Sequence, residues 1–152
     1  MNIYFYDTVI GKIGIAETGG NITNVYFEKD SLPQEVIEVQ TSLLFEASQQ
    51  LDRYLNGELK QFTLPFAPVG TPFMQQVWAQ LCDIPYGQTA TYKEIAVRTG
   101  NSKAARAIGL ANNRNPIPVF IPCHRVIGSN GTLTGYRGGL VVKKILLELE
   151  KE

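Results

Sequence analysis

Residues 91–112, TYKEIAVRTGNSKAARAIGLAN, predict two short helices that meet at a tight corner. Thr91 is a good N-cap for a first helix over Tyr92–Arg98, and the glycine that follows is a typical helix end. Ser102 stands where it can cap a second helix, from Lys103 to about residue 112. Two helices joined by a short turn with a glycine form the helix-turn-helix pattern, but many helical proteins contain such a corner without binding nucleic acid.

The start of the second helix and the charge distribution favour a polyanionic partner. Small alanines around Lys103 and Arg106 let the backbone approach a surface closely, and the two cations can meet phosphates. Residues 1–70 contain four basic and nine acidic side chains, whereas residues 71–152 contain ten basic and five acidic ones. This asymmetry predicts a polyanion partner for the second half. Two lobes of opposite charge that merely attract each other are the alternative.

The next segment, residues 115–126 with the sequence NPIPVFIPCHRV, carries the candidate chemistry. Its three prolines exclude a helix or a central strand, so Cys123 stands on a rigid, irregular backbone. A free thiol has a pKa of ~8.5 and needs a base to become nucleophilic at neutral pH, and His124 is the only histidine. Adjacent side chains of an extended segment point to opposite sides, so a water or a turn has to connect the two. An unreactive cysteine beside a surface histidine is the alternative.

The cysteine and histidine content argues against a metal centre. Cys82, Cys123 and a single histidine cannot supply a four-ligand zinc site of the usual type, so we expect no structural metal. We also expect no cofactor. Cys82 falls on the apolar face of a helix that we expect from Pro72 to before Pro85, capped by the preceding threonine. We therefore interpret Cys82 as core packing.

The first half of the chain predicts a sheet followed by a helix. Residues Ile3–Ile10, Lys12–Glu17 and Asn21–Phe27 are rich in β-branched and aromatic side chains and are separated by glycines, as in a meander of strands. Apolar residues then recur at helical spacing from Pro33 to Leu55, and Gln61–Pro68 is a plausible further strand. The expected fold class is α+β, with an N-terminal antiparallel sheet plus helix and a mostly helical C-terminal half.

Prolines and glycines around Val69 mark the expected boundary between an N-terminal lobe, residues 1–69, and a C-terminal domain, residues 70–152. The C-terminal domain should end in a helix from about Gly139 to Glu150. The N-terminus lacks the pattern of a signal peptide, and no segment reaches the ~18 apolar residues of a membrane span. These features predict a cytoplasmic protein that does not enter a membrane.

The motif Ile121-Pro122-Cys123-His124-Arg125-Val126 resembles the acceptor motif of the O6-alkylguanine-DNA alkyltransferases, also called methylated-DNA–protein-cysteine methyltransferases. Further segments resemble blocks of that family in the same order, from about Thr71 to Glu150, whereas the first 70 residues match only in layout. These segments are Thr71–Trp78, Ile84–Gly87, Thr91-Tyr92, Lys103–Ala107, Asn115-Pro116 and Gly135–Leu140. The resemblance implies a ribonuclease-H-like first lobe and a monomer that repairs double-stranded DNA containing alkylated guanine.

The resemblance also implies roles for single residues. Cys123 would take the alkyl group permanently, in one turnover, and His124 would act as its base through a water. Glu150 would orient the histidine and stabilise its charged form. Asn115 would brace the turn that carries the cysteine.

For the base and the DNA, the resemblance implies that Tyr92 donates a hydrogen bond toward the purine. Arg106 would enter the base stack from the minor groove when the target nucleotide rotates out. Pro118 and Tyr136 would form walls of the base pocket, while Lys103 is our own candidate for a phosphate contact. Tyr92 and Tyr136 have packing as the alternative.

Two other functions are weighed against this one. A non-enzymatic helix-turn-helix protein that only binds alkyl lesions is the first, but the alkyltransferase-like binders replace the acceptor cysteine, which is present here. A thiol hydrolase that ignores DNA is the second. The cations Arg114, Arg125, Arg137, Lys143 and Lys144 are interpreted as surface charges or supporting pairs, and none of them as catalytic. Activity on O4-alkylthymine stays open.

Overall fold

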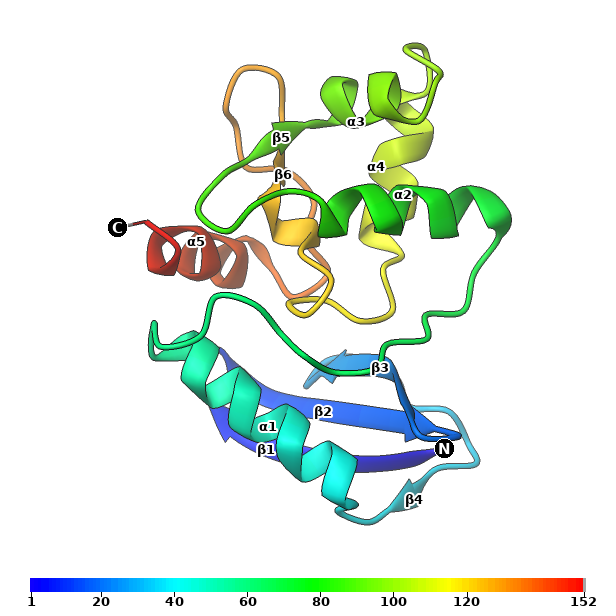
Figure 1. Cartoon of the computed structure of the whole chain (residues 1–152), viewed down its shortest axis with the longest axis vertical. Coiled ribbons are helices and arrows are strands. Elements are labelled where there is room, and N and C mark those ends of the chain that lie inside the picture. The colour runs from blue at the N-terminus through cyan, green and yellow to red at the C-terminus, as the bar shows by residue number, and fades with distance from the viewer. Residues whose placement is uncertain (152) are drawn as a thin grey trace. The chain divides into compact units, whose positions relative to one another are not determined.

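The computed structural model describes residues 1–151. The chain divides into two compact units, Met1–Pro68 and Val69–Glu152. Unit 1 contains an antiparallel sheet and one long helix, and unit 2 is mostly helical (Figure 1). The α+β class predicted from the sequence is confirmed.

Unit 1 is built on a meander. Strands β1 (Asn2–Thr8), β2 (Gly11–Thr18) and β3 (Asn21–Phe27) pair antiparallel, and the short β4 (Ile37–Glu38) adds to β1 in parallel. The sheet order is therefore β3-β2-β1-β4. Helix α1 (Ser42–Leu55) lies along one face of this sheet (Figure 1). Its buried apolar side chains recur at helical spacing and are Leu44, Ala47, Leu51 and Tyr54.

The prediction that this helix starts at Pro33 is wrong, because the residues before Thr41 join the sheet edge. The backbone N–H of Ile37 donates to Met1 O at 2.9 Å, and that of Val39 donates to Ile3 O at 3.0 Å. Thr41 is the real N-cap, since its side chain accepts from Leu44 N. Apolar residues spaced for a helix therefore serve as a strand here, where an open sheet edge can pair with them.

The strand predicted for Gln61–Pro68 is also absent from the described structure. Instead, Phe66 forms an isolated bridge with Ile22. Ile22 N donates to Pro65 O, and Ala67 N donates to Ile22 O. The prolines explain why no longer ladder forms, because each removes a backbone donor.

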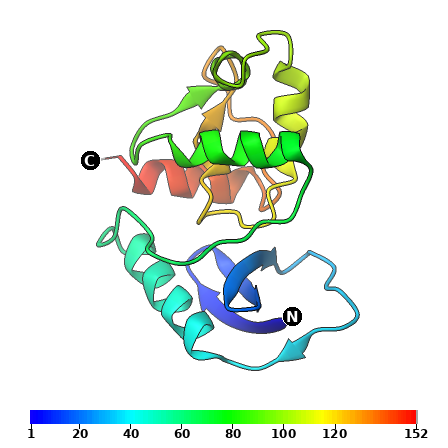
Figure 2. The same cartoon turned by 45° about the vertical axis from the view of Figure 1, so that its right-hand side comes forward.

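Unit 2 holds the helical corner and the cysteine segment. Its elements are α2 (Pro72–Cys82), β5 (Ala90–Thr91), α3 (Tyr92–Arg98), α4 (Ala105–Asn113), the 3-10 turn η1 (Cys123–Arg125), β6 (Val126–Ile127) and α5 (Leu140–Leu149). The short strands β5 and β6 pair in parallel among these helices (Figure 2). Trp78 anchors α2 to α4, since it is 2% exposed and its Nε1 donates to Ala111 O at 3.0 Å.

The helical corner is present, but its second helix starts later than predicted. Thr91 and Glu94 form a capping box at the start of α3, so its predicted cap is confirmed. Ser102 does not cap α4, which begins at Ala105 without a side-chain cap. Asn101 takes over this part of the turn, because its Oδ1 accepts from Lys103 N at 3.0 Å.

The interpretation of Cys82 as core packing is wrong, because its side chain is exposed. It is the last residue of α2, where Leu81 and Ile84 fill the buried positions instead. The final helix of the chain begins one residue after Gly139, whose φ of 96° suits a glycine at the cap. Within residues 1–151, no helix has the length and apolar character needed to cross a membrane.

Candidate functional site

The segment before Cys123 is held by one buried side chain, that of Asn115. Its Nδ2 donates to Ile121 O at 2.8 Å, and its Oδ1 accepts from Ile117 N at 3.0 Å. The side chain is 2% exposed and spans the loop from inside. Val119, at the tip of this loop, has a φ of 73°, a conformation that is costly for a β-branched residue. The sequence therefore builds a rigid and locally strained approach to the cysteine.

Cys123 begins the turn η1 and is 4% exposed. Its backbone N–H donates to Ile121 O at 2.8 Å, so the loop fixes its position. Burial raises the pKa of the Cys123 thiol, and this effect outweighs the hydrogen bond from Asn115 and the positive charge of Lys143, which both lower it. The resting sulfur is therefore a protonated thiol at neutral pH, and an acceptor for its proton is required before it can act as a nucleophile.

His124 is the nearest residue in sequence that can supply such an acceptor, and it is completely buried. Its Nε2 lies 2.7 Å from Glu150 Oε2. Burial lowers the pKa of His124, although the bond to Glu150 and its charge oppose this shift. The imidazole is thus neutral at rest. If its Nε2–H donates to the carboxylate, the other ring nitrogen, Nδ1, carries a lone pair that can accept a proton.

Arg125, which sequence reasoning left among the surface or supporting charges, completes this cluster. It is 8% exposed, and its Nε and Nη2 donate to the two oxygens of Glu150 at 2.9 and 3.0 Å. Its Nη1 donates to Ile84 O at 2.8 Å, and its guanidinium lies 5.7 Å from the centroid of the Tyr86 ring. A planar fork of this kind fixes a carboxylate more rigidly than a lysine could. Arg125 therefore fixes the position of the Glu150 carboxylate, which in turn hydrogen-bonds to His124.

Lys143 is a second cation whose position sequence reasoning missed. It is completely buried in α5, and its Nζ donates to Val126 O and Thr134 O at 2.7 Å each. Burial lowers the pKa of Lys143 to about 8, while its interaction with Cys123 raises it. The signal was its spacing, because Lys143 lies three residues before Leu146 and seven before Glu150, on the same buried stripe of the helix. It places a positive charge close to the candidate nucleophile.

The structure places the expected base-pocket residues in the same unit. Tyr92 OH donates to Thr134 O at 3.2 Å, and its ring lies 3.8 Å from where a Cβ on Gly109 would be, so it packs against α4. Tyr136 is 8% exposed, and Pro118 is buried in the acceptor loop. Thr134, the hydrogen-bond partner of Tyr92, lies two residues before Tyr136 in the sequence. Their roles toward a base stay predictions.

The two expected DNA contacts are both exposed. Arg106 is the second residue of α4, and Lys103 lies in the turn before it. Their roles toward DNA remain predictions from the sequence. Among the residues that the structure describes, no group of three or more histidine, cysteine, aspartate or glutamate side chains is arranged to hold a metal ion.

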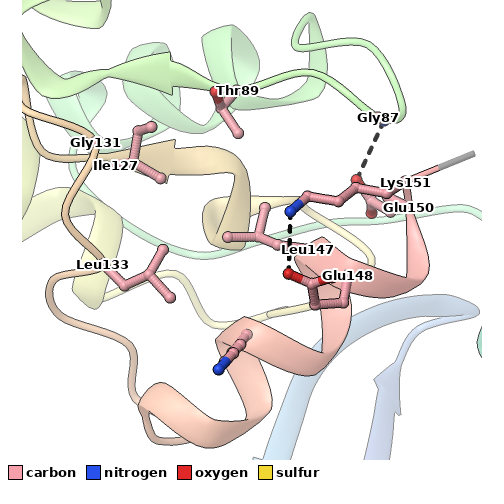
Figure 3. Close-up of a pocket in the computed structure, with 10 residues that line it drawn as sticks. Gly87, Thr89, Ile127, Gly131, Leu133, Leu147, Glu148, Glu150 and Lys151 are labelled. Atoms are coloured by element: carbon pink, nitrogen blue, oxygen red, sulfur yellow. Dashed lines mark hydrogen bonds and ion pairs between the residues drawn. The ribbon is translucent and has the colours of Figure 1, made fainter.

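A pocket of about 240 Å³ is lined in part by Glu150 (Figure 3). Ile127, Leu133 and Leu147 form much of its apolar wall, and Gly87 N donates to Glu150 Oε1 at 3.4 Å beside it. Cys123 is not part of its lining. The pocket therefore borders the carboxylate that holds the histidine but is separate from the candidate nucleophile.

Comparisons with known proteins cover nearly the whole chain. The family model described as "6-O-methylguanine DNA methyltransferase, DNA binding domain" matches residues 72–152, and that of the "ribonuclease-like domain" of the same methyltransferase matches residues 1–68. The chain is 49% identical to a methylated-DNA–protein-cysteine methyltransferase of Methanosarcina barkeri, over 97% of each chain. It is 43% identical to the constitutive methylated-DNA–protein-cysteine methyltransferase of Bacillus subtilis, over 99% of this chain and 96% of that one.

The fold comparison agrees. The crystal structure of Mycobacterium tuberculosis OGT in complex with DNA matches with a TM-score of 0.95 and 42% identity, over 99% of this chain and 93% of that one. An O6-methylguanine-DNA methyltransferase from Pyrococcus kodakaraensis matches with a TM-score of 0.75 and 25% identity, over 97% and 98% of the two chains. Two domain models and close relatives of nearly equal length thus give one answer. The chain belongs to the 6-O-methylguanine DNA methyltransferase family.

Proposed function

We propose that this protein repairs DNA by moving the alkyl group of O6-alkylguanine onto Cys123, which keeps it. The observation that supports the proposal most strongly is the buried cluster of His124, Glu150 and Arg125 beside a buried, protonated thiol. A protein that only binds alkyl lesions in DNA, without a reaction, needs neither a neutral buried imidazole nor a carboxylate whose two oxygens are both hydrogen-bonded. The family relationship and the DNA complex of a relative support duplex DNA as the partner.

The reaction begins with the nucleotide rotated out of the duplex, because the alkyl carbon is otherwise inaccessible within the base stack. Arg106, exposed near the start of α4, fills the gap that the base leaves, and Lys103 contacts a phosphate. The planar guanidinium of Arg106 can stack on bases and donate hydrogen bonds at once. Pro118 and Tyr136 flank the base that enters the protein.

Proton transfer and alkyl transfer then follow. A water carries the thiol proton to Nδ1 of His124, and the resulting imidazolium is stabilised by Glu150. The sulfur of Cys123 forms a bond to the alkyl carbon as the carbon–O6 bond breaks, and the electron pair of that bond stays on the guanine. The hydroxyl of Tyr92, once it turns away from Thr134 O, donates toward the purine and stabilises this leaving anion. The anion then takes a proton from water, and His124 returns the thiol proton to solvent.

The product is a thioether, and no group in the cluster is a nucleophile able to remove its alkyl group. Each molecule should therefore repair one lesion and then stop. O4-alkylthymine presents the same alkyl–oxygen bond next to a ring nitrogen, so it is a second substrate class to test.

The test of the proposal is stoichiometry with duplex DNA that contains O6-methylguanine, where methyl transfer should stop at one group per protein molecule. Cys82→Ser should leave this plateau unchanged, and Cys123→Ser should abolish transfer while duplex binding is kept.

Lys143 provides a separate prediction about the pH dependence. Lys143→Met removes the positive charge that lowers the pKa of Cys123, so the rate near pH 7 should fall about tenfold, the effect of roughly one pKa unit. Wild-type Lys143 itself loses its proton above a pKa of about 8. The difference between wild type and variant should therefore shrink as the pH rises through 8.

The measurement is the single-turnover alkylation rate from pH 6.5 to 9.5. Lys144→Met is the matched control, since its side chain is an exposed neighbour on the same helix and should change little. Circular dichroism has to show a folded variant, because the methionine leaves the carbonyls of Val126 and Thr134 without their donor. A constant rate ratio across the pH range would contradict the electrostatic role.

A further inference from the structure

The pocket beside Glu150 has no part in the reaction proposed above, because Cys123 does not line it. All of its lining residues belong to unit 2, so it is formed within one compact unit. Its apolar wall comes from β6, the segment after it and α5, which contribute Ile127, Leu133 and Leu147 (Figure 3). Each of these side chains remains partly exposed, so an apolar ligand can cover surface that otherwise faces solvent.

The volume of the pocket limits the ligand to a small molecule. Its volume of about 240 Å³ is below the roughly 300–1,000 Å³ that is usual for drug-sized ligands. A water molecule takes up about 30 Å³ in the liquid, so the pocket has room for about eight non-hydrogen atoms with their hydrogens. A chain of six carbons with a carboxylate or a similar small head group has this size.

The charges around the pocket favour an anionic head group. Four charged side chains line it, two of each sign: Lys144, Lys151, Glu148 and Glu150. Glu148 Oε1 lies 3.0 Å from Nζ of Lys151. Glu150 Oε1 lies 2.9 Å from Nε of Arg125, which is outside the lining. Lys144 is exposed and has no ion-pair or hydrogen-bond partner within residues 1–151, so its positive charge is available to a ligand.

We propose that this pocket binds a small aliphatic carboxylate, with the chain against the apolar wall and the carboxylate beside Lys144. An apolar lining with a few placed polar groups is the usual pattern of small-molecule sites. A cationic ligand fits less well, since both carboxylates of the lining already have partners. The inference goes beyond the proposed function and does not depend on it, because the pocket and Cys123 are separate.

The test compares three probes with the same six-carbon chain: hexanoate, hexan-1-ol and hexylamine. Each is titrated into the isotope-labelled protein, and the backbone amide signals are followed by NMR. Hexanoate should bind saturably with a Kd of about 1 mM, which is reasonable for so small a ligand, and should shift the amides of Gly87, Thr89 and Gly131. Hexan-1-ol should bind about two- to fivefold more weakly, the effect of one exposed ion pair, and hexylamine more weakly still.

Three variants assign the binding to the pocket. Lys144→Met removes the charge, so hexanoate should then bind no better than hexan-1-ol, whose own affinity should stay close to wild type. Lys93→Met is the matched control, because it removes an exposed lysine of α3 outside the lining and should keep the preference for hexanoate. Leu133→Trp fills the space with a larger apolar side chain and should weaken the binding of all three probes. The same NMR spectra show whether each variant is folded.

Several results would overturn this inference. Wild-type protein without saturable shifts at the pocket amides would mean that no ligand of this class binds there. Hexylamine that binds as tightly as hexanoate, or a preference for hexanoate that persists in Lys144→Met, would contradict the role of Lys144. Unchanged binding in a folded Leu133→Trp variant would place the probes elsewhere on the surface. Failure of alkyl transfer would overturn the proposed function and leave this inference standing.

Discussion

Glu150→Gln should lower the alkylation rate near neutral pH by roughly ten- to a hundredfold, which is up to the lower end of what a positioned acid–base group contributes, because the imidazole base itself stays in place. The carboxylate lies 2.7 Å from Nε2 of His124, so its charge stabilises the imidazolium that forms when the thiol proton leaves. Glutamine keeps the shape but removes this charge. His124→Ala should do at least as much damage. The double variant should lose much less than the sum, because the two residues act as one unit.

The pH dependence identifies the cause. Burial lowers the pKa of His124 below its usual 6.5, so the wild-type rate should be maintained down to below pH 6.5 and should fall only when the imidazole gains a proton. Burial raises the pKa of Cys123, so variants without the base should recover rate only at alkaline pH, where hydroxide forms the thiolate. Rates equal to wild type at pH 7 in both folded single variants would rule out the relay.

Folding is the necessary control for Glu150→Gln. Arg125 binds both oxygens of Glu150, and loss of the charge on one partner of a buried pair costs about 3–5 kcal/mol. Rates should therefore be compared at a temperature where circular dichroism shows every variant folded. Affinity for duplex DNA with the lesion should stay close to wild type, since Glu150 is 2% exposed and cannot contact DNA directly.

Arg106→Ala should slow repair of duplex DNA by about ten- to a hundredfold and leave the reaction with free O6-benzylguanine nearly unchanged. Rotation of a nucleotide out of the duplex costs a few kcal/mol, which an inserted side chain offsets, whereas a free base has no stack to leave. Every 1.4 kcal/mol lost corresponds to a tenfold slower reaction. The exposed position of Arg106 near the start of α4 makes the residue available for this role.

The measurement compares single-turnover rates of wild type and variant on both substrates. Arg98→Ala is the matched control, because it removes an exposed arginine from the preceding helix, α3. Equal losses on duplex and free base would contradict insertion and would mean that Arg106 supports the fold of the site. Binding of the wild type to undamaged duplex should weaken as the salt concentration rises, since phosphate contacts release counterions.

Local signals were sufficient to predict much of unit 2. The cap at Thr91 satisfies free backbone donors of α3 whatever the rest of the chain does, so the sequence alone reveals it. The three prolines before Cys123 likewise determine local backbone geometry. The start of helix α1 was predicted nine residues too early. The apolar residues before it suit a strand as well as a helix, and pairing with the edge strand β1 places them in the sheet.

Charged residues whose place depends on distant partners were not predictable. Lysine and arginine usually lie at the protein surface, and only the fold shows the carbonyls that pair with Lys143 and the carboxylate that pairs with Arg125. Buried charges need such partners, and these lie 9 and 17 residues from Lys143 and 25 residues from Arg125 in sequence. The pairing of His124 with Glu150 was expected from the family resemblance, not from spacing. Cys82 was misplaced because helical periodicity cannot tell a buried flank from an exposed one at a helix end.

The most direct test of the central claim is the mass of the intact protein after incubation with duplex DNA that contains O6-methylguanine. Transfer of a methyl group to the thiol replaces its hydrogen, so the protein should gain the mass of one CH2 unit, and peptide mapping should locate it on Cys123. No further gain should follow when more DNA is added. A protein of unchanged mass beside repaired DNA, or a modification located on Cys82, would contradict permanent transfer to Cys123.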